Sequence, residues 1–195
     1  MKLLFITGFL GSGKTTLLLE IVKSLKGASK RIAIIENEVG QIGIDGKYLK
    51  QEGLEVQELF GGCICCALSV NLVITLKKLD QLFHPELTII EPSGIARAGD
   101  IVDTINREIP DIAGIQVVTV VDASRYKALL EVMSPLLTSQ IQAAQIVAIN
   151  KTDKVDNKNI NFIVESVGQL NSQAKITAIS AEEKVNLEAV LKDLM

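Results

Sequence analysis

Apolar residues along this chain gather in short runs, and most of these runs are separated by stretches with helical spacing. In the stretch 15–26, for example, Leu18, Ile21, Val22 and Leu25 recur at the three- and four-residue intervals of a helix face. Alternation of strands and helices predicts a parallel sheet covered by helices, and several runs lack the polar alternation of half-exposed strands. The predicted strands are 2–6, 31–35, 86–90, 116–121, 145–149 and 175–179, with 55–59 as a further possible strand.

The composition fits one globular domain over residues 1–195, because 48% of the residues are hydrophobic and the 4 prolines are scattered. A net charge of -3, with basic residues spread along the chain, argues against a nucleic-acid-binding face. The apolar runs are too short to span a membrane. All 3 cysteines fall within residues 63–66, an odd count typical of a reducing compartment, so we expect a cytoplasmic protein.

Residues 8–15 carry a complete G-x-x-x-x-G-K-[ST] phosphate loop between the predicted strand 2–6 and the predicted helix 15–26. Its glycines allow backbone N–H groups to turn toward phosphates, and the helix N-terminus adds its dipole. We expect Lys14 to reach the terminal phosphates and the Thr15 hydroxyl to bind Mg²⁺. The predicted nucleotide contacts are Gly8, Gly11, Ser12, Gly13, Lys14, Thr15 and Thr16.

The segment Asn150-Lys151-Thr152-Asp153 follows a predicted strand and looks like the N-K-x-D guanine-specificity motif of GTPases. A carboxylate at Asp153 can accept from guanine N1–H and the exocyclic amine, an arrangement that adenine lacks. Lys151 can lay its methylene stem along the base, and Asn150 is expected to brace the loop. Ser180 and Ala181 resemble the short segment whose backbone N–H contacts guanine O6, so GTP or GDP is the predicted ligand. A small-molecule kinase is a rival that this motif disfavours.

Glu91 ends the apolar run 87–90, and Gly94 follows three residues later. In nucleotide hydrolases this pattern marks an acidic loop beside the phosphates, so Glu91 is expected to hold Mg²⁺ through a water or to orient the attacking water. The alternative for Glu91 is a simple helix cap. We expect the Gly94 N–H to contact the terminal phosphate. The predicted catalytic set is Lys14, Thr15 and Glu91, and further help with Mg²⁺ is expected from Glu36 or Asp45.

Cys63, Cys65 and Cys66 form a C-x-C-C cluster beside two glycines. Three thiolates favour Zn²⁺, Cu⁺ or another thiophilic ion and leave one coordination position open. Buried cysteines without a ligand are the alternative. Glu36 and Glu38 are further candidate ligands, although both also fit a solvated loop.

Together these elements resemble the CobW/HypB/UreG family of metal-associated GTPases, and most closely its CobW-like branch. The resemblance rests on the phosphate loop, Glu36-Asn37-Glu38, the cysteine cluster, Glu91 with Gly94, and Asn150 to Asp153. It implies a three-layer P-loop NTPase fold with a mostly parallel central sheet flanked by helices. It also implies GTP hydrolysis coupled to delivery of zinc, cobalt or nickel to a client metalloprotein, with nucleotide-dependent homodimers in several members.

Two departures from the family pattern limit how many of the family's properties we expect in this chain. Gln41 stands where CobW-like members often carry a glutamate, and the chain stops after a predicted helix at 186–194, where many members continue into a C-terminal domain. We therefore expect a bare GTPase domain, a domain that works with a separate partner, or a truncated chain. Turnover should be slow without a partner, because the sequence presents no evident water-positioning glutamine or arginine. The alternative function is a GTP-dependent docking switch for a client metalloprotein, with a purely structural metal.

Overall fold

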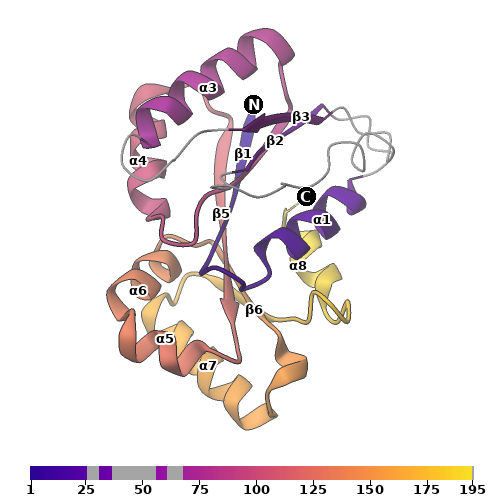
Figure 1. Cartoon of the computed structure of the whole chain (residues 1–195), viewed down its shortest axis with the longest axis vertical. Coiled ribbons are helices and arrows are strands. Elements are labelled where there is room, and N and C mark those ends of the chain that lie inside the picture. Colours follow the sequence, from indigo (N-terminus) through magenta and orange to yellow (C-terminus); the bar gives the residue numbers. More distant parts are fainter. Residues whose placement is uncertain (26–30, 37–55, 61–67, 195) are drawn as a thin grey trace.

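The computed structural model describes residues 1–25, 31–36, 56–60 and 68–194. Within these residues one sheet has seven strands, all parallel, in the order β3-β2-β4-β1-β5-β6-β7 (Figure 1). β1 and β4 lie side by side near its centre, so the chain segments that leave them start from neighbouring positions. The strands are β1 (Lys2–Thr7), β2 (Ile32–Glu36), β3 (Val56–Phe60), β4 (Leu87–Glu91), β5 (Gly114–Asp122), β6 (Ile146–Asn150) and β7 (Lys175–Ala178).

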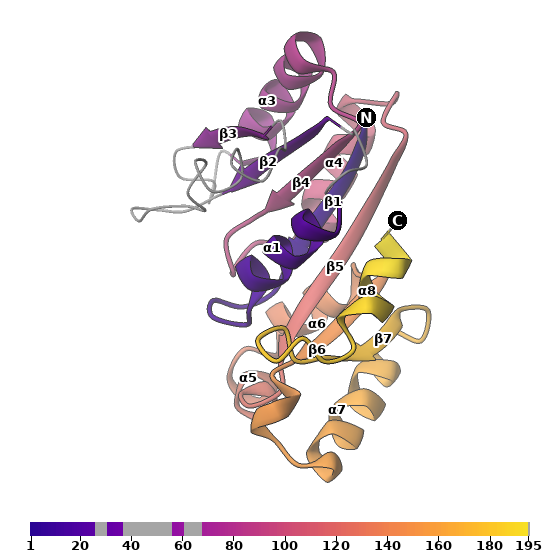
Figure 2. The same ribbon diagram turned by 90° about the vertical axis from the view of Figure 1, so that its right-hand side faces the viewer.

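Helices cover both faces of the sheet because its strands are apolar on both sides. In β1, Leu3 and Phe5 join the core cluster under α3, α4, α6 and α7, whereas Leu4 and Ile6 join the cluster under α1 and α8. Figure 2 shows α1 and α8 together on the near side of the sheet. The helices are α1 (Lys14–Ser24), α3 (Leu68–Phe83), α4 (Ala98–Glu108), α5 (Tyr126–Val132), α6 (Ser134–Gln142), α7 (Asn157–Leu170) and α8 (Leu187–Leu194), with a 3₁₀ turn η1 (Thr152–Lys154).

The predicted three-layer α/β architecture is confirmed, and each predicted strand, including 55–59, overlaps an observed one. Several strands run one residue further than the apolar pattern indicated, because backbone pairing continues through a polar residue at the carboxyl end. Glu36 pairs in register with Glu91, and Asp122 pairs with Asn150. Polar side chains therefore end neighbouring strands at one edge of the sheet, where parallel α/β folds bind their ligands.

No helix in the described part of the chain is long and apolar enough to cross a membrane.

Candidate nucleotide site

The phosphate loop, residues 8–15, links the end of β1 to the start of α1. Its glycines Gly8, Gly11 and Gly13 have φ angles of 133°, 74° and 98°, in the left-handed region that side chains rarely adopt. A Cβ atom on Gly13 would also collide with the side-chain amide of Asn150, and one on Gly8 with the Val120 carbonyl. The glycine pattern is therefore required by both backbone conformation and close packing.

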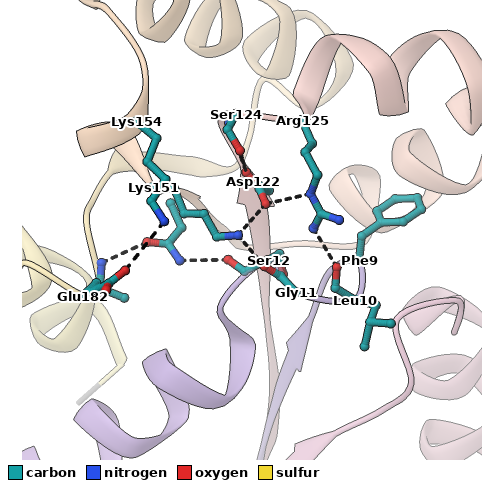
Figure 3. Close-up of polar contacts among 12 residues, drawn as sticks. Phe9, Leu10, Gly11, Ser12, Asp122, Ser124, Arg125, Lys151, Lys154 and Glu182 are labelled. Atoms are coloured by element: carbon teal, nitrogen blue, oxygen red, sulfur yellow. Dashed lines mark hydrogen bonds and ion pairs between the residues drawn. The ribbon is translucent and has the colours of Figure 1, made fainter.

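Four consecutive carbonyls of the phosphate loop accept hydrogen bonds from side chains, three of which come from distant parts of the chain. The loop shape is thus set by the protein's own contacts. Figure 3 shows two of these donors, Arg125 and Lys151, reaching the loop from the segments that follow β5 and β6. The donors are Lys14 Nζ to Phe9 (3.3 Å), Arg125 Nη2 to Leu10 (2.6 Å), Lys151 Nζ to Gly11 (2.6 Å) and Asn150 Nδ2 to Ser12 (2.8 Å).

Asp122 is a buried carboxylate that holds two of these donors (Figure 3). Its Oδ2 accepts from Lys151 Nζ at 2.7 Å and from Arg125 Nε at 2.9 Å, while Oδ1 accepts from the Ser124 hydroxyl at 2.6 Å and the Ser124 N–H at 3.0 Å. Burial by itself raises the pKa of Asp122, but the bonds from Lys151, Ser124 and Arg125 outweigh it and hold that pKa below its ordinary value. We call Asp122, Arg125, Asn150 and Lys151 the carbonyl brace.

The residues predicted to read guanine lie together at the ends of β6 and β7. The Asn150 side-chain oxygen accepts from the Ala181 N–H at 2.9 Å, so Asn150 joins the phosphate loop to the 180–181 segment. A hydrogen bond from the buried Ser180 hydroxyl to the Asp153 carboxylate lowers the pKa of Asp153, which is itself exposed. Lys151 follows β6 with a φ of 64°, and its ammonium group reaches Gly11 and Asp122.

On the other side of the phosphate loop, the Thr15 hydroxyl donates to both carboxylate oxygens of Glu91, at 3.0 and 3.2 Å. Lys14 Nζ lies 3.9 Å from Glu91 Oε1. Burial lowers the pKa of Lys14; nearby Glu91 opposes this effect and Arg125 adds to it. Hydroxyl and carboxylate oxygens are the hard ligands that Mg²⁺ prefers, so Thr15 and Glu91 fit the predicted ion. Thr16 is exposed in the first turn of α1.

The segment after β4, residues 92–96, packs against the phosphate loop, and we call it the β4 loop. A Cβ atom on Gly94 would lie only 2.5 Å from the Leu10 backbone nitrogen, so the two backbones approach closely. Gln140, fully buried in α6, donates from Nε2 to the carbonyls of Gly94 and Ala96, both at 3.1 Å. The buried Ser93 hydroxyl has no hydrogen-bond partner among the described residues.

Most of the predicted metal ligands fall outside the described residues: Cys63, Cys65, Cys66, Glu38 and Asp45. Glu36 is described and ends β2, in register with Glu91. Within the described residues, no three or more histidine, cysteine, aspartate or glutamate side chains gather as a metal site would require.

Three residues that shape this site were not predicted from the sequence. Asp122 could have been found, because it directly follows the apolar run 116–121 just as Glu91 and Asn150 follow theirs. Arg125 stands three residues beyond Asp122 and had no signal apart from that neighbour. Gln140 lies in the last turn of α6, and nothing in its local sequence distinguishes it from a surface glutamine.

Comparison with known proteins agrees with this geometry. Residues 2–178 match the CobW/HypB/UreG, nucleotide-binding domain family. The zinc chaperone CobW of Sinorhizobium sp is 34% identical over 97% of this chain and 61% of the relative. The zinc-regulated GTPase metalloprotein activator 1 of Schizosaccharomyces pombe is 32% identical over 88% of this chain and 44% of the relative.

The chain therefore spans only about half the length of these relatives. Among solved structures, the hydrogenase maturation factor HypB of Archaeoglobus fulgidus has the same fold, with a TM-score of 0.71 at 18% identity, covering 100% of this chain and 88% of that one. A family match over most of the chain and a curated relative above 30% identity lead to the same conclusion: this chain belongs to the CobW/HypB/UreG family.

Proposed function

We propose that this protein binds GTP and hydrolyses it to GDP and phosphate. The observation that carries the proposal is the position of Asn150, which bonds to Ser12 of the phosphate loop and to Ala181 beside the Ser180–Asp153 pair. One side chain thus connects the phosphate-binding segment to the segment that selects the base. Asp153 can accept from two guanine N–H groups, whereas adenine offers no such pair of donors.

The described residues divide the chemistry among them. Lys14 neutralises charge on the terminal phosphates, and Gly94 presents its N–H from the β4 loop. Thr15 and Glu91 would hold Mg²⁺, which when bound offsets the charge of the β- and γ-phosphates. Glu91, which contacts Thr15 and Lys14, is also our candidate for orienting a water for attack on the terminal phosphate. Arg125 and Lys151, the cations described beside the loop, bond to its carbonyls, so hydrolysis should be slow without a partner or a dimer.

We further propose that GTP hydrolysis is coupled to the transfer of a metal ion. The support for this coupling is the family match, the names of the relatives, and the sequence position of the thiols. Cys63 follows the end of β3 by three residues, β3 pairs with β2, and β2 pairs with β4, which ends in Glu91. The cargo would be zinc, cobalt or nickel held by Cys63, Cys65 and Cys66, and the recipient would be a client metalloprotein.

Nucleotide selectivity is the first test. The unaltered protein should hydrolyse GTP and not ATP, and Asp153→Asn should weaken GTP binding by about a hundredfold, because a carboxylate that accepts two hydrogen bonds is lost. Asp156→Asn is the matched control, since this residue only caps α7 through the Asn159 N–H and asparagine caps equally well. Equal turnover of ATP and GTP would overturn the assignment.

The metal is tested separately by titrating the reduced protein with Zn²⁺, Co²⁺ and Ni²⁺ in GDP and in a non-hydrolysable GTP analogue. A change in metal affinity of about tenfold between the two nucleotides, lost when all three cysteines become serine, is expected of a chaperone. Equal affinities in both nucleotides would instead favour a docking switch with a structural metal.

A further inference from the structure

We propose that Asp122 is a positioning residue for nucleotide binding, acting through Arg125 and Lys151 on the carbonyls of the phosphate loop. The inference rests on the proposed GTP site and assigns it a residue outside all of its sequence motifs. The hydrogen bonds given for the Asp122 carboxylate go to Ser124, Arg125 and Lys151 and not to the loop itself. The carboxylate holds two cations, and each cation makes its other bond to one of two adjacent loop carbonyls, Leu10 and Gly11.

The geometry fixes both cations at once. Oδ2 of Asp122 accepts from Arg125 Nε and Lys151 Nζ, and Oδ1 is taken by Ser124, so each carboxylate oxygen has two donors. The side chain is fully buried, and its orientation is set by these bonds. Arg125 has a rigid planar guanidinium group, so fixing Nε also directs Nη2, which bonds to Leu10 at 2.6 Å.

A purely structural ion pair would explain the burial of Asp122 but not the loop contacts. Buried ion pairs contribute little to stability compared with apolar packing of similar volume. This one differs because its two cations come from segments 26 residues apart (125 and 151) and meet on the same four-residue stretch of backbone. The arrangement therefore specifies the loop conformation rather than the fold of either segment.

The same geometry distinguishes positioning from direct contact with the substrate. Phosphate loops bind anions through backbone N–H groups, whereas Arg125 and Lys151 bond to loop carbonyls. Loss of the carboxylate should thus weaken GDP and GTP alike. An arginine that touched the terminal phosphate would affect only the GTP-bound state and the rate of hydrolysis.

The test compares Asp122→Asn, Arg125→Gln and the double variant, using a fluorescent GDP and a fluorescent non-hydrolysable GTP analogue as probes. Asp122→Asn should weaken both probes by about tenfold or more, since charge-assisted bonds to two cations are lost. Arg125→Gln should weaken both by a smaller factor. Because both residues act on one loop, their effects should not be independent. The fold loss of affinity in the double variant should be smaller than the product of the two single losses.

Asp193→Asn is the matched control, because Asp193 pairs with Lys175 at the start of β7, on the opposite edge of the sheet from the phosphate loop. The affinity of Asp193→Asn for both probes should equal that of the unaltered protein. Thermal melts of every variant separate loss of fold from loss of affinity, since the folded fraction of a merely destabilised protein binds normally.

Three outcomes would overturn the inference. A folded Asp122→Asn variant with unchanged affinity excludes the role of the carboxylate. If that variant does not fold, the half-exposed Arg125 can still be replaced, and unchanged affinity of Arg125→Gln then excludes the arginine arm. If Arg125→Gln hydrolyses GTP more slowly but binds GDP normally, Arg125 contacts the terminal phosphate instead. Failure of the unaltered protein to bind either probe would overturn the proposed function itself, a result distinguishable from all three.

Discussion

The phosphate loop has two supports of different kinds, the carbonyl brace on one side and the β4 loop on the other. They meet at Leu10, whose carbonyl accepts from Arg125 and whose nitrogen lies against Gly94. The brace consists of charged or amide side chains with a buried carboxylate at its centre. The β4 loop is held by the neutral amide of Gln140 and carries a buried Ser93 hydroxyl without a partner among the described residues.

Under the proposed function, this difference predicts that the two supports serve binding and hydrolysis separately. Charge-assisted bonds are roughly twice as strong as neutral ones, so the brace sets the loop before nucleotide arrives. A segment held by a few neutral bonds is more easily rearranged, and it lies where the terminal phosphate is expected. We therefore expect changes in the brace to alter affinity for any guanine nucleotide. Changes in the β4 loop should alter hydrolysis and leave GDP binding intact.

The largest expected effect is the loss of Asn150. In Asn150→Ala, the Ser12 carbonyl and the Ala181 N–H lose their partner. At about 2 kcal/mol for each buried group, GDP affinity should fall about a thousandfold, measured by fluorescence titration. Asn171→Ala is the control, because Asn171 also bonds to buried backbone groups, those of Ile141 and Ala144, but far from the site. Similar losses of GDP affinity in both variants would erase the distinction between the brace and the rest of the fold.

A methyl group on the β4 loop should separate hydrolysis from binding. In Gly94→Ala the new Cβ would push the loop away from Leu10, and a displacement of about 1 Å at a reacting centre can lower kcat by about a hundredfold. GDP affinity should stay within about twofold. Gly99→Ala is the matched control, since its Cβ would meet only Ala143 at 3.9 Å. Loss of GDP affinity in Gly94→Ala would contradict the division proposed above.

Removal of the amide that holds the β4 loop should have a smaller effect. Gln140→Met keeps the side-chain volume but leaves the Gly94 and Ala96 carbonyls unpaired, so the free energy of unfolding should fall by about 2 kcal/mol. Hydrolysis should slow by about tenfold while GDP affinity is retained. Urea denaturation and turnover assays provide the measurements. Gln142→Met, on the exposed side of the same helix, should change neither quantity.

The smallest effect concerns pH. The folded-state pKa of Asp122 is lowered, so its contribution to stability is complete above the unfolded value of about 3.9 and is lost as pH falls through the folded value. The difference in unfolding free energy between the unaltered protein and Asp122→Asn should thus be constant near neutral pH and shrink in acid. Urea titrations at several pH values measure it. A difference that grows as pH falls would show that the sign is wrong.

The sequence was sufficient to predict the strands, because buried parallel strands read as apolar runs. It also located the motif residues, because phosphate and guanine sites need fixed residue types, and their contacts to nucleotide stay predictions. It was insufficient for contacts that depend on three-dimensional neighbours. Arg125 reaches Leu10 across 115 positions of the chain, and Gln140 reaches Gly94 across 46. No local pattern encodes such a pair. Asp122 lay between these cases, since its place at the end of an apolar run was visible but its two cationic partners were not.

Strands that end on a polar residue also affect how this protein can tolerate changes in length. Glu36, Glu91, Asp122 and Asn150 are each fixed by the last paired position of a strand, so their spacing is set by the sheet and not by the connecting segments. The turn between α4 and β5 and the turn between α6 and β6 enter the sheet at its opposite edge. Insertions there would lengthen a surface turn at modest entropic cost and leave the spacing of the nucleotide site unchanged.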